Sequence, residues 1–306
     1  MRQPCVMPPR PERCGAAGAG RRAGLWACSG LLGLLLGACS TPPAPPLNPV
    51  QLQLQARNQN GVRAWQRGDL PAALGSYREA LTAAQSVEDF DAAGTALLNL
   101  AAVHGRLGQA DAAQARLDLI VNAPQRYSLA LQAQAAARKA LLFLDQADPA
   151  SALRWADRAE TNCAEPCALA PAMANLRAYL ALRQGDARRA ADLATRAARL
   201  AAGAGLGAEQ ANGLRLAGRA ETRLGNTGAA AALLAQALQL DSELGLPERI
   251  ALDLQCSAEN EERRGQPAMA RDFYERALVV AQAAGDSVTV QTLRTRLATA
   301  AAIPPP

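Results

Sequence analysis

The feature that most limits how this chain can fold is a short motif that occurs six times at nearly constant spacing. The copies read RGDLPAALGSYREAL (67–81), LGQADAAQARLDLIV (107–121), QADPASALRWADRAE (146–160), QGDARRAADLATRAA (184–198), LGNTGAAAALLAQAL (224–238) and RGQPAMARDFYERAL (264–278). Their turn residues are 40, 39, 38, 40 and 40 residues apart, and they are Gly68, Gly108, Ala147, Gly185, Gly225 and Gly265. Because glycine accepts the left-handed backbone that ends a helix, each copy predicts a turn between two helices.

Small residues stand at matched positions on both sides of each turn. Five residues after the turn every copy has alanine: Ala73, Ala113, Ala152, Ala190, Ala230 and Ala270. Seven residues before it every copy has glycine or alanine: Gly61, Ala101, Ala140, Ala178, Gly218 and Ala258. Small side chains on facing helices let the two backbones approach closely. The pattern therefore predicts helical hairpins that stack on one another and share a continuous core.

This pattern resembles the tetratricopeptide repeat (TPR) over residues 51–303, with the second-helix aromatic at Tyr77 in the first copy and Tyr274 in the last. It differs from that family in its period of about 40 rather than 34 residues, and in lacking the first-helix tryptophan and the closing proline. Aromatic residues make up only 3% of the chain, which disfavours strands. The resemblance implies an all-α, right-handed solenoid of six helix pairs. We expect repeats near 50–86, 89–123, 128–161, 168–204, 208–244 and 247–284, and a capping helix at 286–302.

The N-terminal region reads as an export signal. The apolar run from Ala23 to Leu36 has 14 residues, whereas a membrane-spanning helix needs roughly 20, and arginines precede it. Leu36-Gly37-Ala38-Cys39 resembles the lipobox of bacterial lipoproteins, which implies that residues 1–38 are removed and that Cys39 carries lipid. An ordinary secretory signal is the alternative. Residues 39–50 are proline-rich and are expected to form a semi-extended linker.

Removal of residues 1–38 changes the interpretation of charge. The full chain carries +5, but the remaining part has 27 basic and 26 acidic residues. Nucleic-acid binding needs a basic domain or stripe, so no nucleic acid is expected as a partner. Ser40 after Cys39 resembles the signal for sorting to the outer membrane, on its periplasmic side, with inner-membrane retention as the alternative.

The residues available for catalysis are few. His104 is the single histidine, and it lies where this repeat has a packed aromatic, so we expect a packed histidine rather than a catalytic one. No enzyme activity, metal or cofactor is expected. Cys163 and Cys167 lie four apart between the third and fourth repeats, and in an exported protein a disulfide is favoured over a zinc site. Cys256 is expected to be a small packed residue.

The concave face is where TPR proteins hold partner peptides, on residues of the first helix of each pair. Carried over by repeat position, this face includes Trp65, Arg106, Tyr179, Arg183, Arg215, Arg219, Arg223, Glu259, Glu262 and Arg263. Arg215, Arg219 and Arg223 follow i, i+4, i+8 spacing and so share a helix face. With Arg183 they could grip carboxylates of an acidic peptide or a chain terminus. A solvated face, partly neutralised by the two glutamates, is an equal alternative.

Two classes of function remain. The first is a lipid-anchored scaffold that mediates protein–protein interactions in envelope assembly, pilus or secretion biogenesis, or control of cell-wall synthesis. The second is a solenoid that binds a glycan or small ligand, or an accessory subunit of an envelope enzyme. A reproducible protein partner, captured from detergent-solubilised membranes, favours the first, whereas a bound sugar or lipid favours the second.

Overall fold

The computed structural model describes residues 48–301, with the side chains of residues 299–301 left aside. The predicted signal peptide, the predicted lipidation site Cys39 and most of the predicted linker lie outside the described residues. None of the described helices is both long enough and apolar enough to cross a bilayer.

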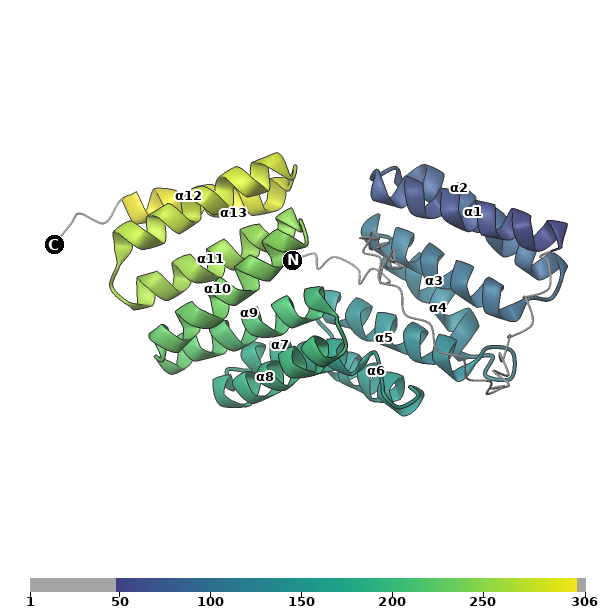
Figure 1. The fold of residues 1–306 in the computed structure, drawn as a ribbon, viewed down its shortest axis with the longest axis horizontal. Helices are drawn as coiled ribbons and strands as arrows, with labels where there is room; N and C mark the ends of the chain where they lie inside the picture. Colours follow the sequence, from purple (N-terminus) through teal and green to yellow (C-terminus); the bar gives the residue numbers. More distant parts are fainter. Residues whose placement is uncertain (1–47, 302–306) are drawn as a thin grey trace, which may run out of the picture.

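The described residues form thirteen α-helices and no strand, which confirms the predicted all-α solenoid of six helix pairs and a C-terminal helix (Figure 1). The first helices of the pairs, called A helices, are α1 (Pro49–Gln66), α3 (Phe90–Arg106), α5 (Leu129–Asp145), α7 (Ala170–Arg183), α9 (Gly207–Leu224) and α11 (Pro247–Arg263). The second helices, called B helices, are α2 (Leu70–Ser86), α4 (Ala110–Val121), α6 (Pro149–Thr161), α8 (Ala187–Gly203), α10 (Thr227–Glu243) and α12 (Pro267–Ala283). The C-terminal helix α13 (Ser287–Ala301) packs on α12.

The turns inside the pairs follow the predicted chemistry. Gly68 adopts a φ of 75°, and the side chain of Asp69, which follows it, accepts a hydrogen bond from the backbone N–H of Ala72 and caps α2. Ala147 occupies the same left-handed region with a φ of 60°, although it carries a side chain. A non-glycine residue in this region costs about 1–2 kcal/mol. The third repeat therefore keeps the shape of the others at a local energetic cost.

Close approach of the two helices explains the small residues seven positions before each turn. A Cβ atom added to Gly61 would lie 2.4 Å from the ring of Tyr77, and one added to Gly218 would lie 2.7 Å from Leu234. The alanines five positions after the turns are almost completely buried, with exposures of 0–3%. The core is thus largely alanine, and leucine or tyrosine fills the space that each glycine leaves.

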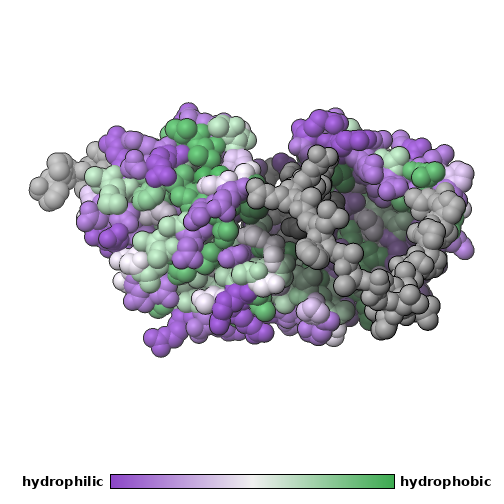
Figure 2. Space-filling model, viewed as in Figure 1, coloured by the Kyte–Doolittle hydropathy of each residue, from purple (hydrophilic) through white to green (hydrophobic). Residues whose placement is uncertain are grey.

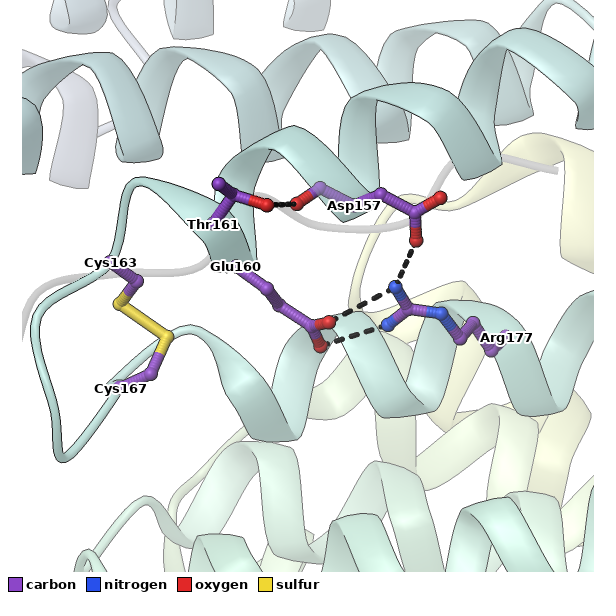
Figure 3. Close-up of a disulfide and its surroundings, with 6 residues drawn as sticks. All are labelled: Asp157, Glu160, Thr161, Cys163, Cys167 and Arg177. Carbon is purple, nitrogen blue, oxygen red and sulfur yellow. Dashed lines mark hydrogen bonds and ion pairs between the residues drawn. A yellow bond between two sulfur atoms is a disulfide. The ribbon is translucent and has the colours of Figure 1, made fainter.

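The junction between the third and fourth pairs differs from most of the others. Three residues join α2 to α3, α8 to α9, α10 to α11 and α12 to α13, whereas eight residues, 162–169, join α6 to α7. Cys163 and Cys167 form a disulfide in this longer loop, with their Cα atoms 5.4 Å apart. Figure 3 shows Arg177 of α7 reaching back to α6, where its guanidinium lies 2.6 Å from Asp157 and 2.8 Å from Glu160. Covalent and ionic links therefore reinforce this junction.

Candidate partner-binding groove

The A helices line the inner side of the solenoid. Successive A helices contact one another directly within each half of the solenoid, α1 with α3 and α3 with α5, and more extensively α7 with α9 and α9 with α11. No contact of this extent joins α5 to α7 or joins successive B helices. Helices on the inside of a curved stack are the ones that approach each other most closely. Figure 1 shows the stack bending at α6–α8, and Figure 2 shows the surface hollowed between the two halves. We call this inner side the groove.

Trp65 and Arg106 meet in the N-terminal part of the groove. Trp65 is half-buried near the end of α1, and Arg106 is exposed at the end of α3. The guanidinium carbon of Arg106 lies 5.2 Å from the centre of the Trp65 ring, within range of a cation–π interaction. The structure thus brings together two predicted groove residues from adjacent pairs, and both keep surface open to solvent.

Tyr179, Arg183 and Arg223 meet where α7 and α9 run side by side. The Arg183 guanidinium donates a long hydrogen bond of 3.4 Å to the Tyr179 hydroxyl. Arg223 donates a hydrogen bond to the backbone carbonyl oxygen of Leu182 on α7. This bond across the two pairs holds the end of the Arg223 side chain beside α7, next to the position of Arg183.

Arg219 lies one turn before Arg223 on α9 and is half-buried. Among the described residues, its guanidinium forms neither a hydrogen bond nor an ion pair. Glu259 of α11, one of the two glutamates expected to neutralise this face, accepts a hydrogen bond of 3.1 Å from Gln255. Glu262 and Arg263 are exposed at the end of α11. The positive charge of Arg219 is therefore available to a ligand in the groove.

Arg215 does not belong to the groove surface, and its predicted role there is corrected. It is 4% exposed, and its guanidinium lies between two buried carboxyl groups, 2.6 Å from Asp253 of α11 and 2.9 Å from Asp241 of α10. Each residue advances an α-helix by about 100°. Arg215 and Arg223 are eight residues apart, which is two full turns plus about 80°, so the two side chains leave the helix in directions about 80° apart. That rotation is enough to turn Arg215 from the groove into the contact between the fifth and sixth pairs.

The cluster of Arg215, Asp241 and Asp253 places two buried carboxyl groups beside one buried guanidinium. Both carboxyl groups have 0% exposure, and the guanidinium of Arg249 on α11 is close enough to interact with both of them. Burial raises the pKa of Asp253 to about 7, since the stabilising effect of Arg215 is opposed by the adjacent Asp241 carboxyl. Asp241 Oδ1 and Asp253 Oδ2 have no hydrogen-bond partner among the described residues. A proton held on Asp253 therefore lowers the negative charge that is buried beside Arg215.

The histidine and the unpaired cysteine of the described residues fit structural roles. His104 is 5% exposed, and its Nδ1 atom lies 2.7 Å from the side-chain oxygen of Gln109, so the prediction of a packed histidine is confirmed. Cys256 is buried, and burial raises the pKa of its thiol to about 12, which disfavours the reactive thiolate. In the part of the chain that the structure describes, no group of three or more His, Cys, Asp or Glu residues could hold a metal.

Two buried ionic contacts are not among the contacts predicted from the sequence. Asp241 and Asp253 were not identified, although the buried positions Ala230, Leu234 and Ala237 lead at helical spacing to Asp241. Lys139, the single lysine, is 3% exposed, forms an ion pair with Asp118 and lies 4.2 Å from the centre of the Trp155 ring. Nothing in the local sequence around Lys139 indicates that contact, because its partners lie on two other helices.

No family model matches this chain, and no curated protein matches it. Among solved structures it is similar to a chain of the APC/C hetero-tetramer Cut9–Hcn1, with a TM-score of 0.59 and 14% identity over 81% of this chain and 42% of that one. It is similar to the STAND protein with a tetratricopeptide repeat sensor from Pyrococcus horikoshii, with a TM-score of 0.57 and 13% identity over 81% and 37%.

A third similar structure is PilW, a type IV pilus biogenesis factor, with a TM-score of 0.54 and 18% identity over 81% of this chain and 99% of that one. This chain thus spans nearly all of PilW, but less than half of the other two proteins. At these identities the likeness concerns the fold alone. The chain has the fold of a TPR-like α-solenoid.

Proposed function

We propose that this protein is a lipid-anchored scaffold of the bacterial envelope that holds a protein partner in its groove. The partner presents an acidic peptide segment or a chain terminus to Arg183, Arg219 and Arg223. The observation that carries this proposal is the guanidinium of Arg219, which is half-buried on the concave side and has no hydrogen-bond or ion-pair partner among the described residues. A partly desolvated cation gains most from a carboxylate that binds beside it.

The location rests on the N-terminal sequence. The 14-residue apolar run, the Leu36–Cys39 motif and Ser40 support export, lipidation of Cys39 and sorting to the periplasmic side of the outer membrane. The likeness to PilW, whose whole length matches, supports a role in pilus biogenesis among the possible envelope assemblies. The lack of a recognisable catalytic group around His104 favours a binding role over an enzymatic one.

Replacement of Arg219 and Arg223 by alanine tests the groove. Each charge-assisted hydrogen bond contributes about 1.5–3 kcal/mol, so the double variant should weaken the partner at least tenfold. The partner is first captured from detergent-solubilised membranes and identified, and its affinity for both chains is then measured. Arg219→Ala alone removes no hydrogen bond within the described residues and should weaken binding without loss of helicity by circular dichroism.

Arg271→Ala with Arg276→Ala is the matched control, because it removes two exposed arginines from α12, on the outer side of the solenoid. This control should bind the partner as the unchanged protein does. Equal affinities for the unchanged protein, the two groove variants and the control would show that the arginines of the groove are only solvated. Capture of a sugar or lipid in place of a protein would support the glycan or small-ligand alternative.

A further inference from the structure

Helix α8 has the most one-sided distribution of charge among the B helices. Its inner side consists of alanine: Ala187, Ala190, Ala191, Ala194, Ala197, Ala198 and Ala201 are all buried. Its outer side carries four exposed arginines and one exposed acid: Arg188, Arg189, Arg196, Arg199 and Asp192. We call these four arginines the α8 basic face. At 1.5 Å per residue they span roughly 16 Å along the helix axis.

The other two B helices of the C-terminal half, α10 and α12, differ from α8 in how their charged residues are arranged. On α12, Arg271 lies 2.8 Å from Glu275 and Arg276 lies 3.6 Å from Asp272, so each arginine has its own acid one turn away. On α10, the exposed side holds no arginine and one acid, Glu243. An unpaired basic side is therefore a property of α8 and not of the repeat.

The guanidinium groups of the α8 basic face have no partners in the part of the chain that the structure describes. None of the four forms a hydrogen bond or an ion pair there. Arg196 and Arg199 lie three residues apart on one helix side, where like charges repel each other. Asp192 lies one turn from Arg188 and from Arg196 and is the one acid among these four arginines, so the face keeps an excess of three positive charges (four minus one), which points to an anionic partner outside the chain.

We propose that the α8 basic face docks the solenoid onto the anionic surface of a phospholipid membrane. Guanidinium groups bind phosphate in a bidentate manner, and several headgroups lie within reach of four arginines along one helix. The face lies on the outer side of the solenoid, so docking leaves the groove open. The surface is distinct from the groove, and it holds the solenoid in one orientation.

The choice of a membrane as the occupant rests on the proposed lipid anchor at Cys39. Because α1 begins at Pro49, ten residues, 39–48, would separate it from the proposed anchor. A proline-rich linker extends by about 3.1 Å per residue, so α1 would start within roughly 30 Å of the bilayer. The bilayer is thus the anionic surface that the solenoid meets most often. A lipid chain combined with a basic patch gives more durable membrane binding than a single acyl chain alone.

Vesicle sedimentation tests whether the α8 basic face binds a membrane without help from the lipid anchor. The protein is the mature chain from residue 39 with Cys39→Ser, so that no lipid contributes to binding. The vesicles are pure phosphatidylcholine, or phosphatidylcholine with about one third phosphatidylglycerol. Each basic residue near an anionic surface contributes about a fivefold factor in partitioning. The chain should bind the anionic vesicles, not the neutral ones, and should be released by high salt.

Two matched double variants show whether vesicle binding depends on the α8 basic face or on the overall charge of the protein. Arg196→Gln with Arg199→Gln should lower binding about 25-fold, since two basic residues are lost. Arg271→Gln with Arg276→Gln removes the same net charge from α12 and should change binding less than twofold. Replacement of all four arginines of the α8 basic face by glutamine should abolish binding.

Three results would overturn the proposal. They are equal losses in the two double variants, no preference for anionic vesicles, and α8-dependent binding to an acidic polypeptide or duplex DNA in place of vesicles. Because the tested chain has no lipid and an intact groove, none of these results bears on the groove. Conversely, a failure of the Arg219 experiment leaves vesicle binding unaffected, so the two proposals fail independently.

Discussion

Replacement of Asp253 by asparagine should remove a specific pH dependence of stability. In the folded protein Asp253 is buried beside Asp241 and Arg215, and burial raises its pKa from 3.8 to about 7. Asparagine has nearly the same shape as protonated aspartic acid and cannot ionise. It can still accept the hydrogen bond from Arg215 Nε and donate one to Asp241. The variant therefore resembles the protonated protein at every pH.

The sign of the pH dependence of stability follows from the direction of the pKa shift of Asp253. The folded state binds the Asp253 proton more tightly than the unfolded state, whose pKa stays near 3.8. The stabilisation is complete below pH 4 and is lost as pH rises toward 7, by about 1.4 kcal/mol per pH unit. The total shift corresponds to about 4 kcal/mol. Relative to the unchanged protein, Asp253→Asn should gain about that much stability between pH 4 and pH 8.

Urea denaturation followed by circular dichroism measures this difference, and urea is preferred because guanidinium salts screen charges. Both chains are unfolded at half-unit steps from pH 4.5 to pH 8. The titratable groups far from the cluster are common to both chains, so subtraction of the two curves isolates Asp253 together with the groups that titrate with it. A difference that stays constant with pH, or that falls as pH rises, would refute the account of the buried acid pair.

Three further predictions concern packing, redox state and anchoring. Gly213→Ala should destabilise the protein by about 1–3 kcal/mol because the new Cβ would lie 2.8 Å from the backbone of α8, whereas Gly228→Ala, with open space around it, should stabilise by up to about 1 kcal/mol in the same urea titration. Mass spectrometry of unreduced protein should find Cys163 joined to Cys167, and two free thiols in exported protein would contradict this. Cys39→Ser should abolish metabolic labelling with a fatty acid, and persistent labelling would rule out the lipobox.

The fold could be predicted because each signal acts within one helix pair. Gly68 and its equivalents set the turns through their own backbone, and Gly61 is required by a contact only one helix away, with Tyr77. The position of His104 within its repeat likewise predicts a side chain packed inside its own helix pair, and His104 is buried. Even Ala147 was placed correctly at a turn, because repeat spacing outweighed its poor fit to the left-handed region. Local geometry repeated six times leaves few alternatives.

The Arg215 cluster could not be predicted in the same way, because it forms between pairs. Helical spacing assigns Arg215, Arg219 and Arg223 to neighbouring parts of one helix side, but it does not say which neighbouring helix covers that side. The covering helices α10 and α11 bring Asp241 and Asp253 to Arg215 alone. A usable signal was present in Asp241 itself. A carboxyl group on an otherwise apolar helix stripe needs a buried cation, and an arginine on an adjacent helix is the natural source.

The residues that line the groove can differ from one repeat to the next, because the repeat requires a small residue only at the position just before them. Ala178, Gly218 and Ala258 must be small, since each faces the B helix of its own pair. The residue that follows each of them is Tyr179, Arg219 or Glu259, and all three are half-buried on the groove side. Successive A helices thus present an aromatic ring, a cation and an anion at one repeat position. If the proposed partner crosses the groove as an extended segment, it meets these groups in order, so we expect its sequence of apolar, acidic and basic residues, more than its total charge, to determine its affinity.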